Sequence, residues 1–373
     1  MADSEVRLGD AVMAFFIGPQ SSEMSNALGT VQNPGYLVLV DADGSFRTVK
    51  TKHMDMMRPV WSDHGLHFAD ESSDYHLTAS GLTKADNPKA SAQNLMFALP
   101  NGESVGVYNG GHGDDGGYDN QVAVMTDGDT HLFPVQGNYF TGARCDGQIF
   151  GVAENPGNHK SQAPKRPGMV STVDEIASPQ MLARLYPADD GEKVIGWRPQ
   201  FGTTPTGEVP CHEGVVTFLS WDTDAAGREQ PNVVSWDTAT GDHQVHRLTF
   251  DDATLINDAD IDYVEQDWQG DRLHWVYADG RVFSTDSRTG KTTTLFDTKL
   301  GTGPDRPMQT LHAFSDTQLH TLSTTREGEG SLTYTVFHRA NGATARTVSI
   351  PIPHAAVHVS YLNLSYMTVR PEV

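Results

Sequence analysis

Short segments of the chain alternate apolar and polar positions, and they come in pairs joined by a small glycine-containing turn. Alternation with a period of two on both sides of a tight turn is the pattern of a β-hairpin. Seven such hairpins occur, at residues 36–49, 74–86, 121–135, 181–197, 232–248, 281–295 and 334–350. Their turn glycines are 37 to 63 residues apart. This spacing indicates a sevenfold internal repeat.

Most of these hairpins follow a second pattern, in which two strands flank a tight polar turn. It is found at residues 58–70, 95–109, 141–154, 207–221, 262–279 and 309–324. Each repeat therefore contains four antiparallel strands, here called a to d. Seven four-stranded units predict an all-β fold, the seven-bladed β-propeller, and no long segment shows the helical period.

The two ends of the chain complement each other. The N-terminus supplies strands b, c and d of the first blade but no strand a, and residues 357–369 form a spare strand after the seventh blade. We expect that strand to join the N-terminal blade, which closes the ring and covers an exposed sheet edge. The prediction is one domain over residues 1–373, with blades at 11–52 together with 355–370, 53–88, 92–137, 139–199, 204–250, 260–298 and 306–353.

Two hairpins, at residues 234–242 and 282–291, are similar to those of a known protein family. With them the chain resembles bacterial seven-bladed β-propeller repeat proteins of the quinoprotein-like and YVTN type. The resemblance implies the propeller architecture over most of the chain. The regular tryptophan docking motifs of the quinone-binding members are missing, so the resemblance does not extend to a quinone cofactor.

The charge of the chain limits its partners. The formal net charge is -22, and such a field repels phosphate backbones and anionic headgroups. We therefore expect neither nucleic acid binding nor membrane insertion. No apolar run approaches membrane-spanning length, and residues 12–17 are too short for a signal peptide. These features fit a cytosolic chain or a mature secreted one.

Both cysteines of the chain, Cys145 and Cys211, end strand a of a blade, in blades four and five. Because such strand ends approach each other in neighbouring blades, a disulfide is geometrically reasonable. Two buried free thiols are the alternative. A disulfide implies an oxidising compartment, so the sequence favours an extracytoplasmic protein and leaves the cytoplasm open.

Long connections collect on one face of the predicted propeller, the face of the b–c and d–a connections. They are residues 18–35, 84–94, 109–120, 154–179, 222–231, 250–259 and 299–307. Long loops concentrated on one face are typical of a recognition surface, and the alternative is that they only cap the channel mouth.

Candidate binding residues lie on strand a or at this loop-rich mouth. They are His53, Arg58, Tyr139, Asp260, Asp262, Gln309, His312, His354 and His358. Most other histidines, including His67 and His76, alternate within strands and are expected on sheet surfaces or between blades. The acidic loop at residues 109–120 offers Asp114, Asp115 and Asp119 as oxygen ligands for a divalent cation such as calcium, or is a mobile polar loop.

The sequence contains no nucleophile elbow, P-loop, dinucleotide fingerprint or zinc-protease motif. We therefore predict a binding or scaffolding protein that holds a partner protein or a small polar or saccharide-like ligand at its long-loop face. The alternative is a propeller enzyme, a metal-dependent lyase or hydrolase that acts at the channel mouth. The sequence does not decide whether the protein is an enzyme.

Overall fold

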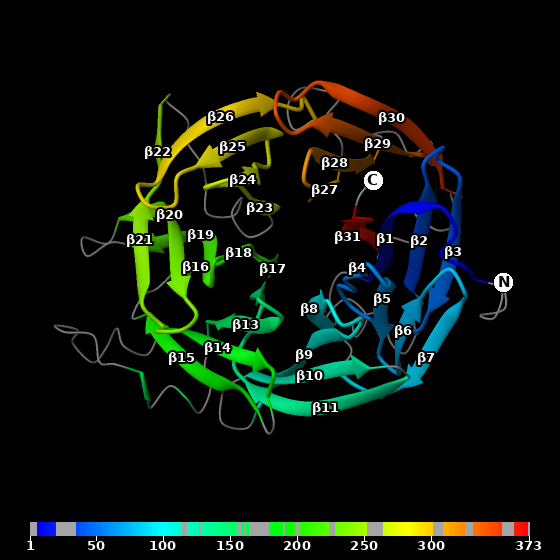
Figure 1. Cartoon of the computed structure of the whole chain (residues 1–373), viewed down its shortest axis with the longest axis horizontal. Coiled ribbons are helices and arrows are strands. Elements are labelled where there is room, and N and C mark those ends of the chain that lie inside the picture. The colour runs from blue at the N-terminus through cyan, green and yellow to red at the C-terminus, as the bar shows by residue number, and fades with distance from the viewer. Residues whose placement is uncertain are drawn as a thin grey trace. The chain divides into compact units, whose positions relative to one another are not determined.

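The computed structural model describes residues 6–19, 35–90, 92–113, 118–126, 128–154, 159, 162–163, 179–188, 191–198, 202–223, 228–251, 264–300, 309–324, 331–352 and 362–371. Their strands form seven sheets, each built around antiparallel strands, and the chain is an all-β, seven-bladed β-propeller, as the repeat predicted (Figure 1). None of the described residues forms a helix long and apolar enough to cross a membrane. The chain divides into two compact units. Unit one holds residues 1–108, 123–132 and 296–373, and unit two holds 109–122 and 133–295.

Unit one contains three complete sheets. The first has the order β3 (Phe46–Thr51), β2 (Gly35–Asp41), β1 (Ala11–Pro19) and β31 (Leu362–Val369). The second consists of β4 (Val60–Ser62), β5 (Gly65–Asp70), β6 (Ser73–Leu77) and β7 (Leu82–Asp86). The third consists of β27 (Thr310–Phe314), β28 (Gln318–Thr324), β29 (Ser331–His338) and β30 (Thr344–Pro351).

Strand β31 closes the first sheet, which confirms the predicted use of the C-terminal strand. It pairs with β1 from Met13 opposite Val369 to Pro19 opposite Leu362. Strand β1 is buried along nearly its whole length, with Met13 to Phe16 fully inaccessible. A strand that is apolar on both faces needs neighbours on both edges, and β2 and β31 provide them.

Unit two contains three sheets of five strands. The fourth blade consists of β12 (Thr141–Cys145), β13 (Gln148–Ala153), β14 (Gln180–Tyr186), β15 (Lys193–Arg198) and β17 (Gly207–Glu208). The fifth has β16 (Gly202–Thr203), β18 (Cys211–His212), β19 (Val215–Thr223), β20 (Glu229–Asp237) and β21 (His243–Arg247). The sixth has β22 (Thr249–Phe250), β23 (Gln266–Gln269), β24 (Arg272–Val276), β25 (Arg281–Thr285) and β26 (Lys291–Asp297).

The third blade, whose residues belong to both units, has a shorter b–c connection than expected. Its strands are β8 (Ala92–Ala98), β9 (Ser104–His112), β10 (Tyr118–Thr126) and β11 (Asp129–Gln136). Strands β9 and β10 extend well into the stretch 109–120, which the sequence analysis assigned to a loop. Glycine permits this, because a Cβ at Gly110 would overlap the carbonyl oxygen of Asp119. Strands β19 and β20 likewise take up half of the expected connection 222–231.

The first strand of the fifth blade is broken, and its middle part belongs to the neighbouring sheet. Strands β16 and β18 pair with opposite ends of β19, whereas β17 pairs in parallel with β12. The Thr141 hydroxyl donates to Thr204 Oγ1 at 2.9 Å, and the Val209 amide donates to the Gly142 carbonyl at 2.8 Å. Cys145 and Cys211 form a disulfide beside this crossing, which confirms the predicted bond.

The recurring turn glycine has two structural reasons. In the fifth and sixth blades an aspartate opens the c–d turn, and the Asp237 carboxylate accepts the amides of Ala239 and Thr240. The turn then requires a left-handed residue, and Gly241 has φ +77° and Gly290 has φ +72°. In addition, a Cβ at Gly241 would overlap the Ile195 carbonyl oxygen of the preceding sheet, and one at Gly290 would overlap that of Arg247. Only glycine satisfies both conditions.

We predict that Gly241→Ala destabilises unit two more than Gly147→Ala does. Both residues have φ near +76°, so the conformational cost of about 1–2 kcal/mol is shared. A Cβ at Gly147 meets nothing within 4 Å, whereas at Gly241 it strikes the neighbouring backbone, which adds roughly 1–3 kcal/mol. Urea unfolding of the two variants measures the difference. Equal losses would contradict the packing role of the turn.

The disulfide gives a second prediction. It links residues 66 apart in the sequence, so its loss, in the double variant Cys145→Ser/Cys211→Ser, is expected to lower the free energy of unfolding by about 2–4 kcal/mol. Urea unfolding with and without reductant measures this, and the double variant serves as the control because reductant leaves it unchanged. Two titratable thiols in the unfolded, unreduced protein would show that the bond is absent.

Candidate functional site

Four partly exposed side chains relevant to binding lie on, or just before, three edge strands of unit one. Strand β31 packs beside both β27 and β4, each of which is the first strand of its sheet (Figure 1). Arg58, Gln309, His312 and Tyr366 are half-buried on or just before these strands. Arg58 and Gln309 belong to d–a connections, which the sequence analysis assigned to the long-loop face.

Arg58 stacks on an aromatic ring that the sequence analysis did not select. Its guanidinium carbon lies 3.3 Å from the centre of the Tyr366 ring, in the geometry of a cation–π contact. The Arg58 amide donates to Oε1 of the buried Gln93 at 2.7 Å, which fixes the backbone beneath the stack. The structure therefore brings Arg58 together with a side chain from the far end of the chain.

Tyr366 occupies an unusual backbone position. In the pairing of β1 with β31, Phe15 lies opposite Met367 and Phe16 opposite Ser365, so Tyr366 is the extra residue of a β-bulge. Its φ of +41° is in the left-handed region, which is a marked outlier for a bulky residue. A bulge changes the direction in which a side chain points, and strained residues of this kind cluster at functional sites.

His53 lies between two carboxylates. Its Nε2 is 3.0 Å from Asp55 Oδ1, and its Nδ1 is 3.9 Å from Glu71 Oε2. Asp55 is fully buried. The close contact with Asp55 raises the pKa of His53, with further support from the charge of Glu71 and against the effect of burial. When it is protonated, His53 thus compensates a carboxylate that burial would otherwise destabilise.

Gln309 and His312 connect strands of unit one. The Oε1 atom of Gln309 accepts the Leu364 amide of β31 at 3.3 Å. His312 Nδ1 lies 3.0 Å from the Thr321 hydroxyl of β28. Burial lowers the pKa of His312 to about 4, so the ring is neutral at physiological pH. Both side chains therefore have structural partners as well as partial exposure.

Tyr139 lies in the interior of unit two. The residue is fully buried, and its ring is so close to Gly137 and Gly151 that a Cβ on either would touch it. Burial raises the pKa of Tyr139 well above its usual range, with a smaller contribution from the charge of Glu192. The structure thus places this candidate in the core of unit two rather than at a surface.

Of the proposed cation ligands, only Asp119 is described. It is exposed on β10, and its Oδ1 lies 3.5 Å from Gln136 Nε2. The described part of the chain contains no group of three or more His, Cys, Asp or Glu side chains arranged to hold a metal ion. Six sequence candidates lie outside the described residues, namely Asp114, Asp115, Asp260, Asp262, His354 and His358.

A buried ionic network in unit one was not predicted. Lys89 Nζ lies 3.3 Å from Asp74 Oδ2, and Asn87 donates to the same oxygen at 2.9 Å. Desolvation lowers the pKa of Lys89, and the charge of Asp74 opposes that shift. The side chain is fully enclosed, so the network fits a structural role. An isolated lysine in a polar loop gave no sequence signal for it.

No protein-family model matches the chain. No curated protein matches it either. Among solved structures, a putative 6-phosphogluconolactonase from Bacteroides uniformis is 11% identical over 95% of this chain and 99% of its own, with a TM-score of 0.49. An apocarotenoid oxygenase mutant from Synechocystis is 8% identical over 98% and 93%, with a TM-score of 0.49. BamB from Moraxella catarrhalis is 11% identical over 79% and 73%, with a TM-score of 0.42. Such similarities describe a fold and do not indicate a function.

The His53 contact predicts a pH dependence. A raised pKa in the folded state gives a stabilisation that is complete below the unfolded value of 6.5 and is lost as the pH rises through the folded pKa. His53→Gln is therefore expected to cost roughly 1.5–3 kcal/mol near pH 6 and less at pH 9.

Urea unfolding of the wild type and His53→Gln at both pH values tests this prediction. The difference between the two proteins isolates His53 from the other histidines. A cost that does not change with pH would contradict the charged contact.

Proposed function

We propose that the protein is an extracytoplasmic binding or scaffolding protein, and that its b–c and d–a connections form the binding face for a partner protein or a small polar ligand. The observation that carries this proposal is the stack of Arg58 on Tyr366. The strained β-bulge at Tyr366 fixes the direction of the Tyr366 ring. The pair is half-buried, and Arg58 itself belongs to the d–a connection that precedes β4.

The chemistry of this pair suits recognition. Arginine and tyrosine are the residue types that most often dominate binding energy at interfaces, and a stacked guanidinium offers several donors in a fixed plane. In a chain of net charge -22, a localised cation favours a ligand or partner that presents carboxylates or other acceptors. An aromatic ring at the same place also suits the flat face of a sugar.

The disulfide supports the proposed compartment. A bond between Cys145 and Cys211 forms and persists in an oxidising environment and is rare in a reducing cytosol. It supports a location outside the cytoplasm, where a scaffold or a ligand receptor of this type acts.

The proposal predicts that binding depends on Arg58. A glycan array and a displayed peptide library, each screened with the purified protein, should yield ligands whose affinity falls about tenfold or more in Arg58→Ala, because truncating a central hot-spot residue costs about 2 kcal/mol or more. Arg58→Lys should lose part of the affinity, since lysine keeps the charge but not the planar stack.

Arg288→Ala is the matched control. Arg288 is an exposed arginine in the c–d turn of the sixth blade, on the face opposite to the b–c and d–a connections in the propeller order of strands. Its variant should bind like the wild type. Ligands that bind Arg58→Ala as tightly as the wild type, or the absence of any ligand in both screens, would contradict the proposal.

A further inference from the structure

A pocket of about 250 Å³ lies within unit one, apart from the Arg58–Tyr366 pair. Its lining residues are His67, His76, Thr83, Gly102, Met125, Thr126 and Gly128. Gly102 and Gly128 belong to the a–b and c–d turns of the third blade, so the pocket opens among the short turns. An engineered cavity of about 150 Å³ binds benzene, so this pocket has room for a molecule somewhat larger than a six-membered ring.

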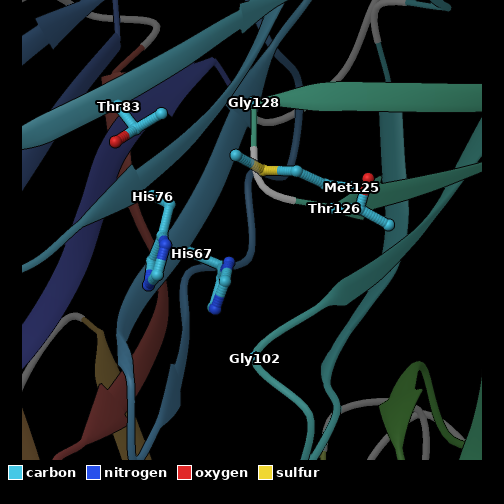
Figure 2. A pocket seen from close by; sticks show the side chains of 7 residues that line it. All are labelled: His67, His76, Thr83, Gly102, Met125, Thr126 and Gly128. Carbon is cyan, nitrogen blue, oxygen red and sulfur yellow. The ribbon is translucent and has the colours of Figure 1, made fainter.

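Two histidine rings form one wall of the pocket. His67 on β5 and His76 on β6 are directly opposite each other in the sheet, and their rings stack at 4.1 Å with an angle of 6° (Figure 2). The sequence analysis had placed both on a sheet surface or between blades. Figure 2 shows Met125 and Thr126 across from the rings and Thr83 beside them. His67 is only 1% exposed.

The hydrogen bonds around Ser62 assign the tautomer of His67. The Ser62 hydroxyl donates to the Gly65 carbonyl at 3.3 Å and accepts the His64 amide at 3.1 Å. Its oxygen also lies 3.4 Å from His67 Nε2. Because the hydroxyl proton is already engaged, Nε2 carries the imidazole proton and donates it.

The other nitrogen of His67 is then an acceptor without a donor. Nδ1 is buried and has no hydrogen-bond partner among the described residues. Leaving a buried acceptor unpaired costs about 1–3 kcal/mol, so a donor that reaches Nδ1, whether water or a ligand hydroxyl, is stabilised there. A ligand reaches Nδ1 only when lining side chains shift, and the unbranched thioether of Met125 is suited to such a movement.

The lining also limits the charge of the occupant. It contains no Asp, Glu, Lys or Arg. Burial, together with His76 and His64, lowers the pKa of His67 to about 3, so this ring is neutral at physiological pH. A charged ligand would lose its hydration here without gaining a counter-ion, whereas hydroxyl groups can pair with Nδ1 and with the threonine hydroxyls.

We propose that this pocket, here called the histidine pocket, binds an uncharged polyol the size of a monosaccharide, with a ligand hydroxyl donating to His67 Nδ1. This is a second binding site, and it does not depend on the proposed function of the Arg58 face.

Titration with glucose, galactose and myo-inositol tests the proposal, with the imidazole nitrogen resonances of isotope-labelled protein as the readout. At least one of these probes should shift the His67 Nδ1 resonance in a saturable way. Glucuronate and glucosamine are charged probes of similar size, and they should bind about tenfold more weakly or not at all, because each brings an uncompensated charge.

Variants locate the effect. His67→Phe keeps a stacked ring of similar shape and removes the acceptor, so it should abolish probe binding. Thr83→Val lies at an exposed position of β7 and should weaken binding several-fold without affecting folding. His338→Gln, at an exposed histidine on β29, should bind like the wild type.

Three results would overturn the proposal. They are the absence of a saturable shift with all three neutral probes, binding that survives in both pocket variants, and tighter binding of a charged probe or of Zn²⁺ than of the neutral ones. Arg58→Ala should leave the polyol titration unchanged, which separates this test from that of the proposed function.

Discussion

The seating of a c–d turn on the outer strand of the preceding sheet is a contact on which much of the structure depends, and four of the turns make it through their glycine. Within unit one, Gly44 meets Val348 and Gly342 meets Phe296, and within unit two Gly241 and Gly290 meet the backbone of the previous outer strand. A single hairpin sheet cannot bury both of its faces alone. The turn glycine lets neighbouring sheets approach to backbone contact, and this contact sets the angle at which their apolar faces meet. At these four turns, the contact holds one sheet against the next.

Enclosed charges reinforce these junctions in unit two. Arg198 at the end of β15 pairs with Asp222 of β19, and both side chains are fully inaccessible. Gln180 accepts from Arg198 Nη1, and Ser220 and Asn232 donate to the Asp222 carboxylate, whereas Arg198 Nε has no hydrogen-bond partner among the described residues. Such a pair adds little net stability, because desolvation offsets the attraction. It penalises any other register of the two sheets, since a shift would leave a buried charge without its partner. Apolar packing stabilises the contact between neighbouring sheets, and the ion pair restricts the register in which they pack.

Much of the fold could be read from the sequence because alternation and turn residues are local signals. The hairpins, the use of residues 362–369 as a strand of the first sheet and the bond between Cys145 and Cys211 were all predicted. The site was harder to predict, because its features depend on tertiary contacts. Tyr366 is directed by a one-residue bulge against β1, which alternation cannot reveal. Tyr139 lies just before the first strand of its blade, close to where a channel residue was expected, yet Gly137 and Gly151 leave room for its ring in the core.

The histidines show why composition alone cannot give a site its chemistry. His53 has a raised pKa because two carboxylates face it, whereas burial lowers the pKa of His67, His312 and His320. The stabilisation from His53 is lost as the pH rises, and that from the other three is lost as the pH falls below 6.5. The same side chain is thus favoured as a cation beside a buried carboxylate in one place and as a neutral ring in another. The ligands proposed for the Arg58 face and for the histidine pocket differ for the same reason, because the fold leaves different numbers of opposite charges at the two places.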